Sequence, residues 1–167
     1  MYDKLADRIA KHHGTVYRVA IGYVKNVHDA EDITQEVFLK LCTRFKDRPD
    51  DGGFPTESDE KFWLIRVTVN QAKNLLKSSW LKNRNDLDEG IALPEQPDIS
   101  ELELSKYIKQ LKPHYRTVIY LHYFEEYTAK EIATLLDKPH STIQTQLQRA
   151  RESLKKILVK EGISYEE

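Results

Sequence analysis

The stretch "TAKEIATLLDKPHSTIQTQLQRAR", from Thr128 to Arg151, has the proportions of a helix-turn-helix motif. A short helical segment is followed by the turn "KPH" and then by a longer helix, which is the usual layout of this motif. Thr128 and Glu131 have the spacing of a capping box, and Ser141 and Gln144 repeat it, so each pair predicts a helix start. The spacing alone does not distinguish a DNA-binding pair from an ordinary helical hairpin.

In a DNA-binding pair, the second helix enters the major groove and residues near its N-terminus face the bases. The candidates for base contacts are Thr142, Gln144, Thr145, Gln146 and Gln148. Arg149 and Arg151 lie further along the helix and suit phosphate contacts.

Two more helices are predicted before this pair. A short one lies around Ser105 to Lys112, and Pro113 opens the next, because proline suits the first turn of a helix. The preceding stretch, Asn85 to Ser105, holds seven acidic residues and no basic one, and contains two prolines. It reads as an extended acidic linker, and we expect the domain boundary there.

The N-terminal part also has helical periodicity. One apolar stripe runs from Leu5 to Tyr23, and a second amphipathic helix is predicted from Asp29 to Phe45. Two prolines and a Gly-Gly pair then predict a loop over Lys46 to Asp59. Helix resumes from Lys61 to Lys82, with an apolar stripe at Phe62, Ile65, Val69, Ala72 and Leu76. The predicted fold class is all-α.

The net charge of −1 hides a segregation of charge along the 167 residues. Lys61 to Arg84 holds six basic and no acidic residues, and Lys106 to Lys160 holds eleven basic and five acidic ones. Two basic blocks separated by an acidic one indicate polyanion binding at two places. Each block alone is equally typical of a solvated helix face.

Composition excludes several other classes. The chain is 40% hydrophobic and 32% charged, which suits a folded domain. It has no apolar run of membrane-spanning length, and its N-terminus lacks the apolar core of a signal peptide, so a cytoplasmic location is expected. Cys42 is the only cysteine, which excludes an internal disulfide and a multi-cysteine zinc site.

The acidic stretch "DAEDITQE" raises the question of a catalytic or metal site. Asp29, Asp32 and Glu36 share a helix face, and paired carboxylates can bind a metal or share a proton. However, the six histidines are scattered, and no HExxH spacing, glycine-rich phosphate loop or GxSxG motif is present. An acidic face presented to a basic partner fits better.

Taken together, these segments resemble the extracytoplasmic-function (ECF) sigma factors, the compact two-domain class of bacterial transcription initiation factors. "YRVAIGYVKNVHDAEDITQEVFLKL" is similar to the family's polymerase-binding segment, and "FWLIRVTVNQAKNLLK" to its minus-ten helix. The region from Leu111 to Lys156 is similar to its minus-thirty-five domain. The resemblance implies a polymerase-binding and minus-ten domain at residues 1–84, a linker at 85–104, and a helix-turn-helix domain at 105–167, with no further regulatory domain.

The resemblance also implies roles for individual residues. Polymerase contacts are expected from Asp29, Asp32, Gln35 and Glu36, with Ile33 and Phe38 on the buried side. Minus-ten DNA contacts are expected from Lys61, Trp63, Arg66, Asn70, Lys73, Asn74 and Lys77. Minus-thirty-five contacts are expected from Ser141, Thr142, Gln144, Thr145, Gln146, Gln148, Arg149 and Arg151. The loop at Lys46 to Asp59 corresponds to the loop with which the family captures a flipped base of the non-template strand. The acidic linker corresponds to the segment that, in the family, runs through the polymerase channel that later holds RNA.

One departure from the family concerns the recognition helix. The family often has basic residues where this chain has Gln144 and Gln146, and glycine where it has Ser141. Glutamine can form two hydrogen bonds to adenine but neutralises no phosphate. We therefore expect a weaker salt dependence from this helix and a shifted upstream preference.

The expected partners are core RNA polymerase, promoter DNA as duplex and as melted non-template strand, and an anti-sigma factor, which in this family is often membrane-bound. No cofactor, metal or small-molecule substrate is expected, and the chain is not expected to be an enzyme. Two alternatives stay open at this point. One is a free-standing helix-turn-helix regulator, and the other is a helical metal-dependent hydrolase using Asp29, Asp32 and Glu36.

Overall fold

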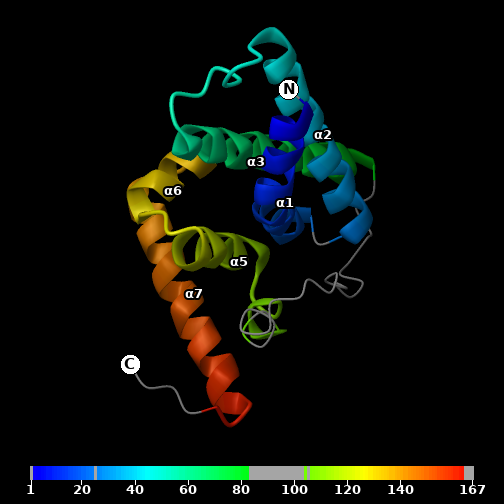
Figure 1. Ribbon diagram of the computed structural model, residues 1–167. Coiled ribbons are helices and arrows are strands. Elements are labelled where there is room, and N and C mark those ends of the chain that lie inside the picture. Colours follow the sequence, from blue (N-terminus) through cyan, green and yellow to red (C-terminus); the bar gives the residue numbers. More distant parts are fainter. Residues whose placement is uncertain (1, 25, 83–103, 105, 164–167) are drawn as a thin grey trace. The chain divides into compact units, whose positions relative to one another are not determined.

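The computed structural model describes residues 2–24, 26–82, 104 and 106–163, and these residues form helices, turns and loops without a strand (Figure 1). The all-α prediction is confirmed. The chain divides into two compact units, Met1–Gly90 and Ile91–Glu167. Most of the predicted acidic linker falls on residues 83–103, which lie outside the described residues.

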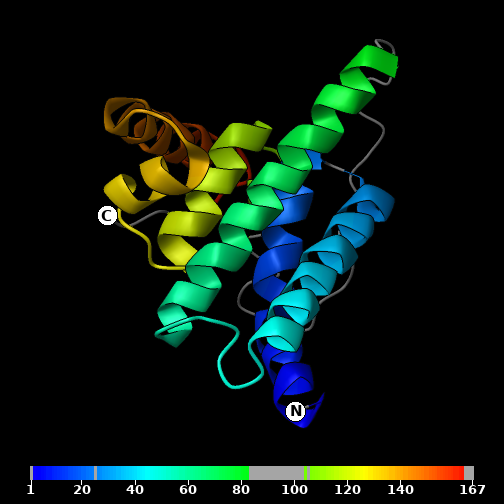
Figure 2. The same ribbon diagram turned by 90° about the horizontal axis from the view of Figure 1, so that it is seen from above.

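The first unit consists of helices α1 (Tyr2–Val24), α2 (Val27–Asp47) and α3 (Glu57–Lys82), each packed against the other two (Figure 2). The predicted stripes supply much of its core. The fully buried apolar side chains described in this unit are Val16, Ala20, Ala30, Val37, Leu41, Leu64, Ile65, Val69 and Ala72. Removing these side chains from water is the main force that holds the three helices together. The prediction of Leu76 as a buried stripe residue is wrong, because its side chain is 40% exposed.

Two caps set helix starts that periodicity did not locate. The Asn26 side chain accepts a hydrogen bond from the Asp29 amide at 3.1 Å, so α2 begins at Val27, two residues before the predicted start. Before α3, the Asp59 amide donates to Thr56 Oγ1 at 3.2 Å, and the Thr56 amide donates to Asp59 Oδ2 at 3.1 Å. This reciprocal pair starts α3 at Glu57, so the predicted loop over Lys46 to Asp59 is too long at both ends.

The loop that remains, residues 48–56, is held against α2 and α3. Arg44 Nε donates to the Gly52 carbonyl at 2.9 Å, and the Gly53 amide donates to Asp51 Oδ1 at 2.7 Å. The Arg44 guanidinium lies 4.2 Å from the centre of the Phe54 ring. Gly52 and Gly53 have positive φ values of 65° and 77°, which favour glycine.

Alanine at Gly52 is expected to lower the free energy of unfolding of the first unit by about 2 kcal/mol, and alanine at Gly53 by about 1 kcal/mol. Both substitutions meet the same kind of backbone strain. A Cβ at Gly52 would also lie 2.7 Å from Cε2 of the buried Phe45 ring. A Cβ at Gly53 meets the exposed Arg48 side chain, whose Cδ lies at 2.9 Å and which can move more easily than a buried ring. Urea unfolding checks this ranking, and equal losses would contradict it.

The second unit contains α5 (Pro113–Ile119), the π-helical turn η1 (Tyr120–Phe124), α6 (Ala129–Leu136) and α7 (His140–Lys160). Residues 104 and 106–108 are helical where the first short helix was predicted, and residues 109 and 110 form a turn. Both α5 and α6 pack against α7. Pro113 occupies the first turn of α5, as predicted.

The two predicted capping boxes have different outcomes. At α6, the Glu131 amide donates to Thr128 Oγ1 at 3.2 Å and the Thr128 amide donates to Glu131 Oε2 at 2.8 Å, which confirms the first box. The prediction of a second capping box, at Ser141 and Gln144, is wrong. Pro139 occupies the cap position of α7, so Ser141 lies inside the helix, where its carbonyl accepts from Thr145 Oγ1 at 3.0 Å. The helix-turn-helix proportions are retained, because Asp137 ends α6 in the left-handed region at φ 54°.

Candidate functional site

The solvent-facing side of α2 carries the predicted acidic residues. Asp32, Gln35 and Glu36 are exposed, while Ile33 and Phe38 are buried, as expected. Asp29 is partly covered in the first turn, where a negative charge is favourable to the helix dipole.

Leu39 adds an apolar group to this acidic side. It follows Asp32 by seven residues and Gln35 by four, so the three share one side of α2. Its side chain is 62% exposed. Sequence reasoning missed Leu39, although its position one helical turn after Gln35 was a usable signal. An exposed leucine among carboxylates is more typical of a surface that binds another protein than of a catalytic site.

The acidic side does not gather the ligands of a metal centre. His28 Nε2 lies 3.6 Å from Asp32 Oδ2, and both side chains are exposed. In the described part of the chain, no three His, Cys, Asp or Glu side chains are grouped so that they could hold a metal ion. The hydrolase alternative therefore has no geometric support.

The predicted minus-ten residues of α3 fall into two groups. Exposed polar side chains come from Arg66, Asn70, Asn74 and Lys77. Lys61 and Lys73 are half-buried and engaged in other interactions. Trp63 is also half-buried, since its ring centre lies 5.4 Å from that of Phe54 and 4.9 Å from the Arg44 guanidinium carbon. The structure therefore joins Trp63 to the 48–56 loop, and the exposed stripe begins at Arg66.

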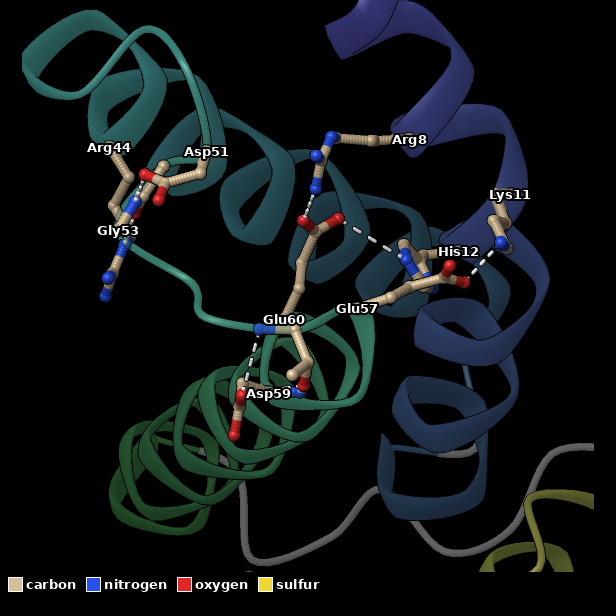
Figure 3. Close-up of polar contacts among 11 residues, drawn as sticks. Arg8, Lys11, His12, Arg44, Asp51, Gly53, Glu57, Asp59 and Glu60 are labelled. Atoms are coloured by element: carbon tan, nitrogen blue, oxygen red, sulfur yellow. Dashed lines mark hydrogen bonds and ion pairs between the residues drawn. The ribbon is translucent and has the colours of Figure 1, made fainter.

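A buried charged cluster at the start of α3 was missed by sequence reasoning (Figure 3). The Glu60 side chain is fully buried, and its Oε2 accepts a hydrogen bond from Arg8 of α1. His12 Nε2 lies 3.4 Å from Glu60 Oε1. Nearby, exposed Lys11 and Glu57 form an ion pair. The cluster joins the first turn of α3 to α1, and Glu60 escaped notice because it precedes the predicted helix.

Burial determines the protonation of His12 in this cluster. The pKa of His12 is lowered because burial disfavours the charged imidazolium, and the carboxylates of Glu60 and Glu57 oppose this effect only in part. His12 is therefore neutral at pH 7, and the charge of Glu60 is balanced by Arg8.

The predicted residues of α7 lie on two sides of that helix. One group lines an open hollow of about 310 Å³ together with His114 and Tyr115 of α5. The α7 residues in this group are Ser141, Thr142, Thr145, Gln146 and Arg149. The others point elsewhere: Gln148 Nε2 lies 3.5 Å from Glu152 Oε1, and Arg151 donates to the hydroxyl of Tyr123 in η1. Gln144 is exposed.

Two family models match the chain in the order of its units. Sigma-70 region 2 matches residues 8–82, and Sigma-70 region 4 matches residues 101–154. The ECF RNA polymerase sigma factor SigW of Bacillus subtilis is 31% identical over 174 residues, covering 93% of this chain and 89% of SigW. The chain belongs to the ECF sigma factors. It is an alternative sigma factor, which directs RNA polymerase to specific promoters.

Other comparisons agree with this family. The RNA polymerase sigma factor SigV of Bacillus subtilis is 28% identical, over 93% of this sigma factor and 92% of SigV. The fold resembles the sigma factor RpoE from Bartonella quintana, solved in complex with the anti-sigma factor NepR, with a TM-score of 0.69 at 20% identity. That match covers 93% of this chain and 96% of RpoE. CnrH, solved with the cytosolic domain of CnrY, gives a TM-score of 0.58 at 19% identity over 96% of this chain and 90% of CnrH.

The matches place the candidate residues of this sigma factor in two regions. Region 2 spans the acidic side of α2, the 48–56 loop and the α3 stripe, and region 4 spans α5, α6 and most of α7. Sigma factors are regulatory proteins rather than enzymes. No helix in the described parts of the chain is long and apolar enough to cross a membrane.

Proposed function

We propose that this sigma factor binds core RNA polymerase through the acidic side of α2, recognises and melts the minus-ten element through α3 and the 48–56 loop, and anchors upstream through α7. The observation that carries the proposal is the order of region 2 and region 4 along one chain, each supplying an exposed polar helix face. The corresponding domains are residues 1–84 and 105–167, joined by a linker at 85–104.

The α2 side suits a basic protein partner. Asp32 and Glu36 provide charge, Gln35 provides an amide, and Leu39 provides apolar area at the same side. Interfaces of this kind use charge for orientation and approach, and a buried apolar anchor for affinity. We propose Asp29 as a contact at the edge of this surface.

The α3 side suits DNA. The cations Arg66 and Lys77 can neutralise phosphates, and the amides of Asn70 and Asn74 can read base edges. Lys61, Lys73 and Trp63 are half-buried beside this stripe, so we propose that they support or border the contact surface. The 48–56 loop is anchored through Arg44, which suits a rigid receptor for a single flipped base.

Gln144 is proposed to read a base in the upstream element, because its side chain is exposed. Gln144→Ala should change the preference at one base pair by about 1–3 kcal/mol. Gln146→Ala should have a smaller effect on base preference, because Gln146 Oε1 is buried. Transcription from promoters with single base-pair changes in the upstream element measures both variants. Unchanged selectivity in Gln144→Ala would contradict the assignment.

We also propose that an anti-sigma factor holds this protein inactive. One solved structure described above contains a sigma factor, RpoE, bound to the anti-sigma factor NepR, and the other contains CnrH bound to the cytosolic domain of CnrY. The protein itself catalyses no reaction and needs no cofactor, since RNA synthesis belongs to the polymerase. Its place of action is the cytoplasm, where bacterial polymerase transcribes.

The test combines the purified chain with bacterial core RNA polymerase and a pool of duplex DNA containing randomised sequence. We expect a stable holoenzyme that enriches a two-part promoter and starts transcription downstream of it. Core polymerase alone serves as the control. Tight binding to duplex DNA without polymerase, and no binding to polymerase, would instead support a free-standing regulator.

A further inference from the structure

The hollow beside α7 brings together groups that the sequence keeps apart. His114 and Tyr115 start α5, whereas Ser141, Thr145 and Arg149 come from α7, about one helical turn apart. The rings of His114 and Tyr115 lie 4.3 Å apart between centroids. The hollow therefore belongs to region 4, but two of its residues lie outside the recognition helix.

The lining has the chemistry of an anion site. Hydroxyl groups come from Tyr115, Ser141 and Thr142, and a guanidinium comes from Arg149. The Thr145 hydroxyl also lines the hollow, but it already donates to the Ser141 carbonyl. Lys112 and Lys138 lie close enough to His114 to affect its protonation. Among the residues that the structure describes, no carboxylate lines the hollow. Hydroxyl donors beside a guanidinium and further cations suit a phosphate group.

We propose that this hollow seats one backbone phosphate of the upstream promoter DNA, and that His114 binds that phosphate in its protonated form. This inference rests on the proposed function of α7. It adds His114 and Tyr115 to the upstream contact surface, and it names the hollow as the place where Arg149 makes its expected phosphate contact. The arrangement makes upstream binding dependent on pH.

The electrostatics of His114 support this dependence. Its pKa is lowered because its surroundings partly exclude water and because Lys138 and Lys112 oppose a further positive charge. A seated phosphate would favour the imidazolium and raise the pKa again. DNA binding then takes up a proton, so affinity must rise as pH falls through the pKa of the complex. The gain levels off below the pKa of free His114.

Gln146 borders the same hollow. Its Oε1 is buried and lacks a hydrogen-bond partner. The NH₂ group at the other end of the same amide can donate a hydrogen bond to an anion. Gln146 is therefore better suited to assist the seated phosphate than to read a base.

The test uses the holoenzyme of the full chain with core polymerase, and a promoter duplex that this holoenzyme has enriched from the randomised pool. Affinity is measured at pH 7.5 and pH 6.0 for wild type, for His114→Gln and for the control His140→Gln. His140 is exposed at the start of α7 and does not line the hollow. We expect wild type and the control to gain about threefold to tenfold more affinity on acidification than His114→Gln, because one pKa unit corresponds to tenfold.

A second measurement locates the phosphate. Single backbone phosphates of the upstream element are replaced by uncharged methylphosphonates. A methylphosphonate at one position should weaken DNA binding by the wild-type holoenzyme and remove the extra affinity that it gains at pH 6.0. The same replacement should weaken binding by His114→Gln clearly less.

The outcomes separate the two proposals. The proposed phosphate seat is wrong if the affinity of His114→Gln follows the wild-type pH profile. It is also wrong if every methylphosphonate weakens wild type and His114→Gln equally. In both cases the proposed sigma function stands. If no duplex is enriched, the proposed function itself fails.

Discussion

Glu60→Ala is expected to lower the free energy of unfolding of the first unit by about 3 kcal/mol, because it breaks an ion pair whose carboxylate is fully buried and leaves a cavity in place of that side chain. Glu60 is fully buried and accepts from Arg8, whose side chain is 32% exposed. The substitution leaves that guanidinium without its carboxylate and creates a void beside His12. The loss should be seen in urea unfolding.

Tryptophan fluorescence isolates this measurement to the first unit, because both tryptophans, Trp63 and Trp80, lie in it. Glu57→Ala is the matched control. Glu57 is also in the first turn of α3 and pairs with a cation of α1, Lys11, but both side chains are exposed. An exposed pair contributes little, because water screens it. Equal effects of the two substitutions would contradict the structural role of Glu60.

Glu60→Gln separates charge from packing. It keeps the volume of the side chain and an oxygen that can accept from Arg8, so the loss should be smaller than with alanine. A loss as large as that of alanine would show that the carboxylate charge, rather than cavity formation, dominates the effect.

The double variant Asp32→Ala/Glu36→Ala is expected to weaken binding to core RNA polymerase about 30-fold to 100-fold. This corresponds to about 2–3 kcal/mol lost from two charged contacts at the centre of an interface. Both residues are exposed on α2, so the folded state should be unaffected. Binding to labelled core polymerase at two salt concentrations measures the effect, and the wild-type affinity should depend more on salt than the variant's does.

Asp47→Ala is the control for this interface. Asp47 is an exposed carboxylate at the end of α2, 11 residues after Glu36 and therefore about 16 Å further along the helix. Its substitution should leave the affinity within about twofold of wild type. If Asp47→Ala weakens binding as much as the double variant does, net charge rather than a defined surface governs the association.

The sequence by itself determined the helices and their order. Helical periodicity depends on neighbours three and four residues apart. The spacing of Ile65, Val69 and Ala72 was therefore enough to predict that these side chains are buried. The Thr128 capping box was equally visible, because it is complete within four residues. The family resemblance rested on local motifs of the same kind, and the region 2 and region 4 matches confirm it.

Other features were present in the sequence but lost to a competing signal. Thr56 and Asp59 had the spacing of a cap, yet the prolines and glycines before them favoured a longer loop, so the start of α3 was predicted too late. Ser141 and Gln144 had capping-box spacing too, but Pro139 takes the cap position and the helix begins at His140. A spacing of three residues specifies a possible cap, and the backbone before it decides whether the cap forms.

Only the tertiary structure decided which distant residues meet. Glu60 is paired with Arg8 because α1 and α3 pack together, and the hollow at Arg149 includes His114 because α5 packs against α7. It likewise divided the polar residues of α7 between the hollow and the side facing Tyr123. The physical reason is that hydrogen bonds, ion pairs and ring contacts act over a few ångströms in space. Periodicity reports the side of one helix on which a residue lies, but not the residue that faces it from another helix.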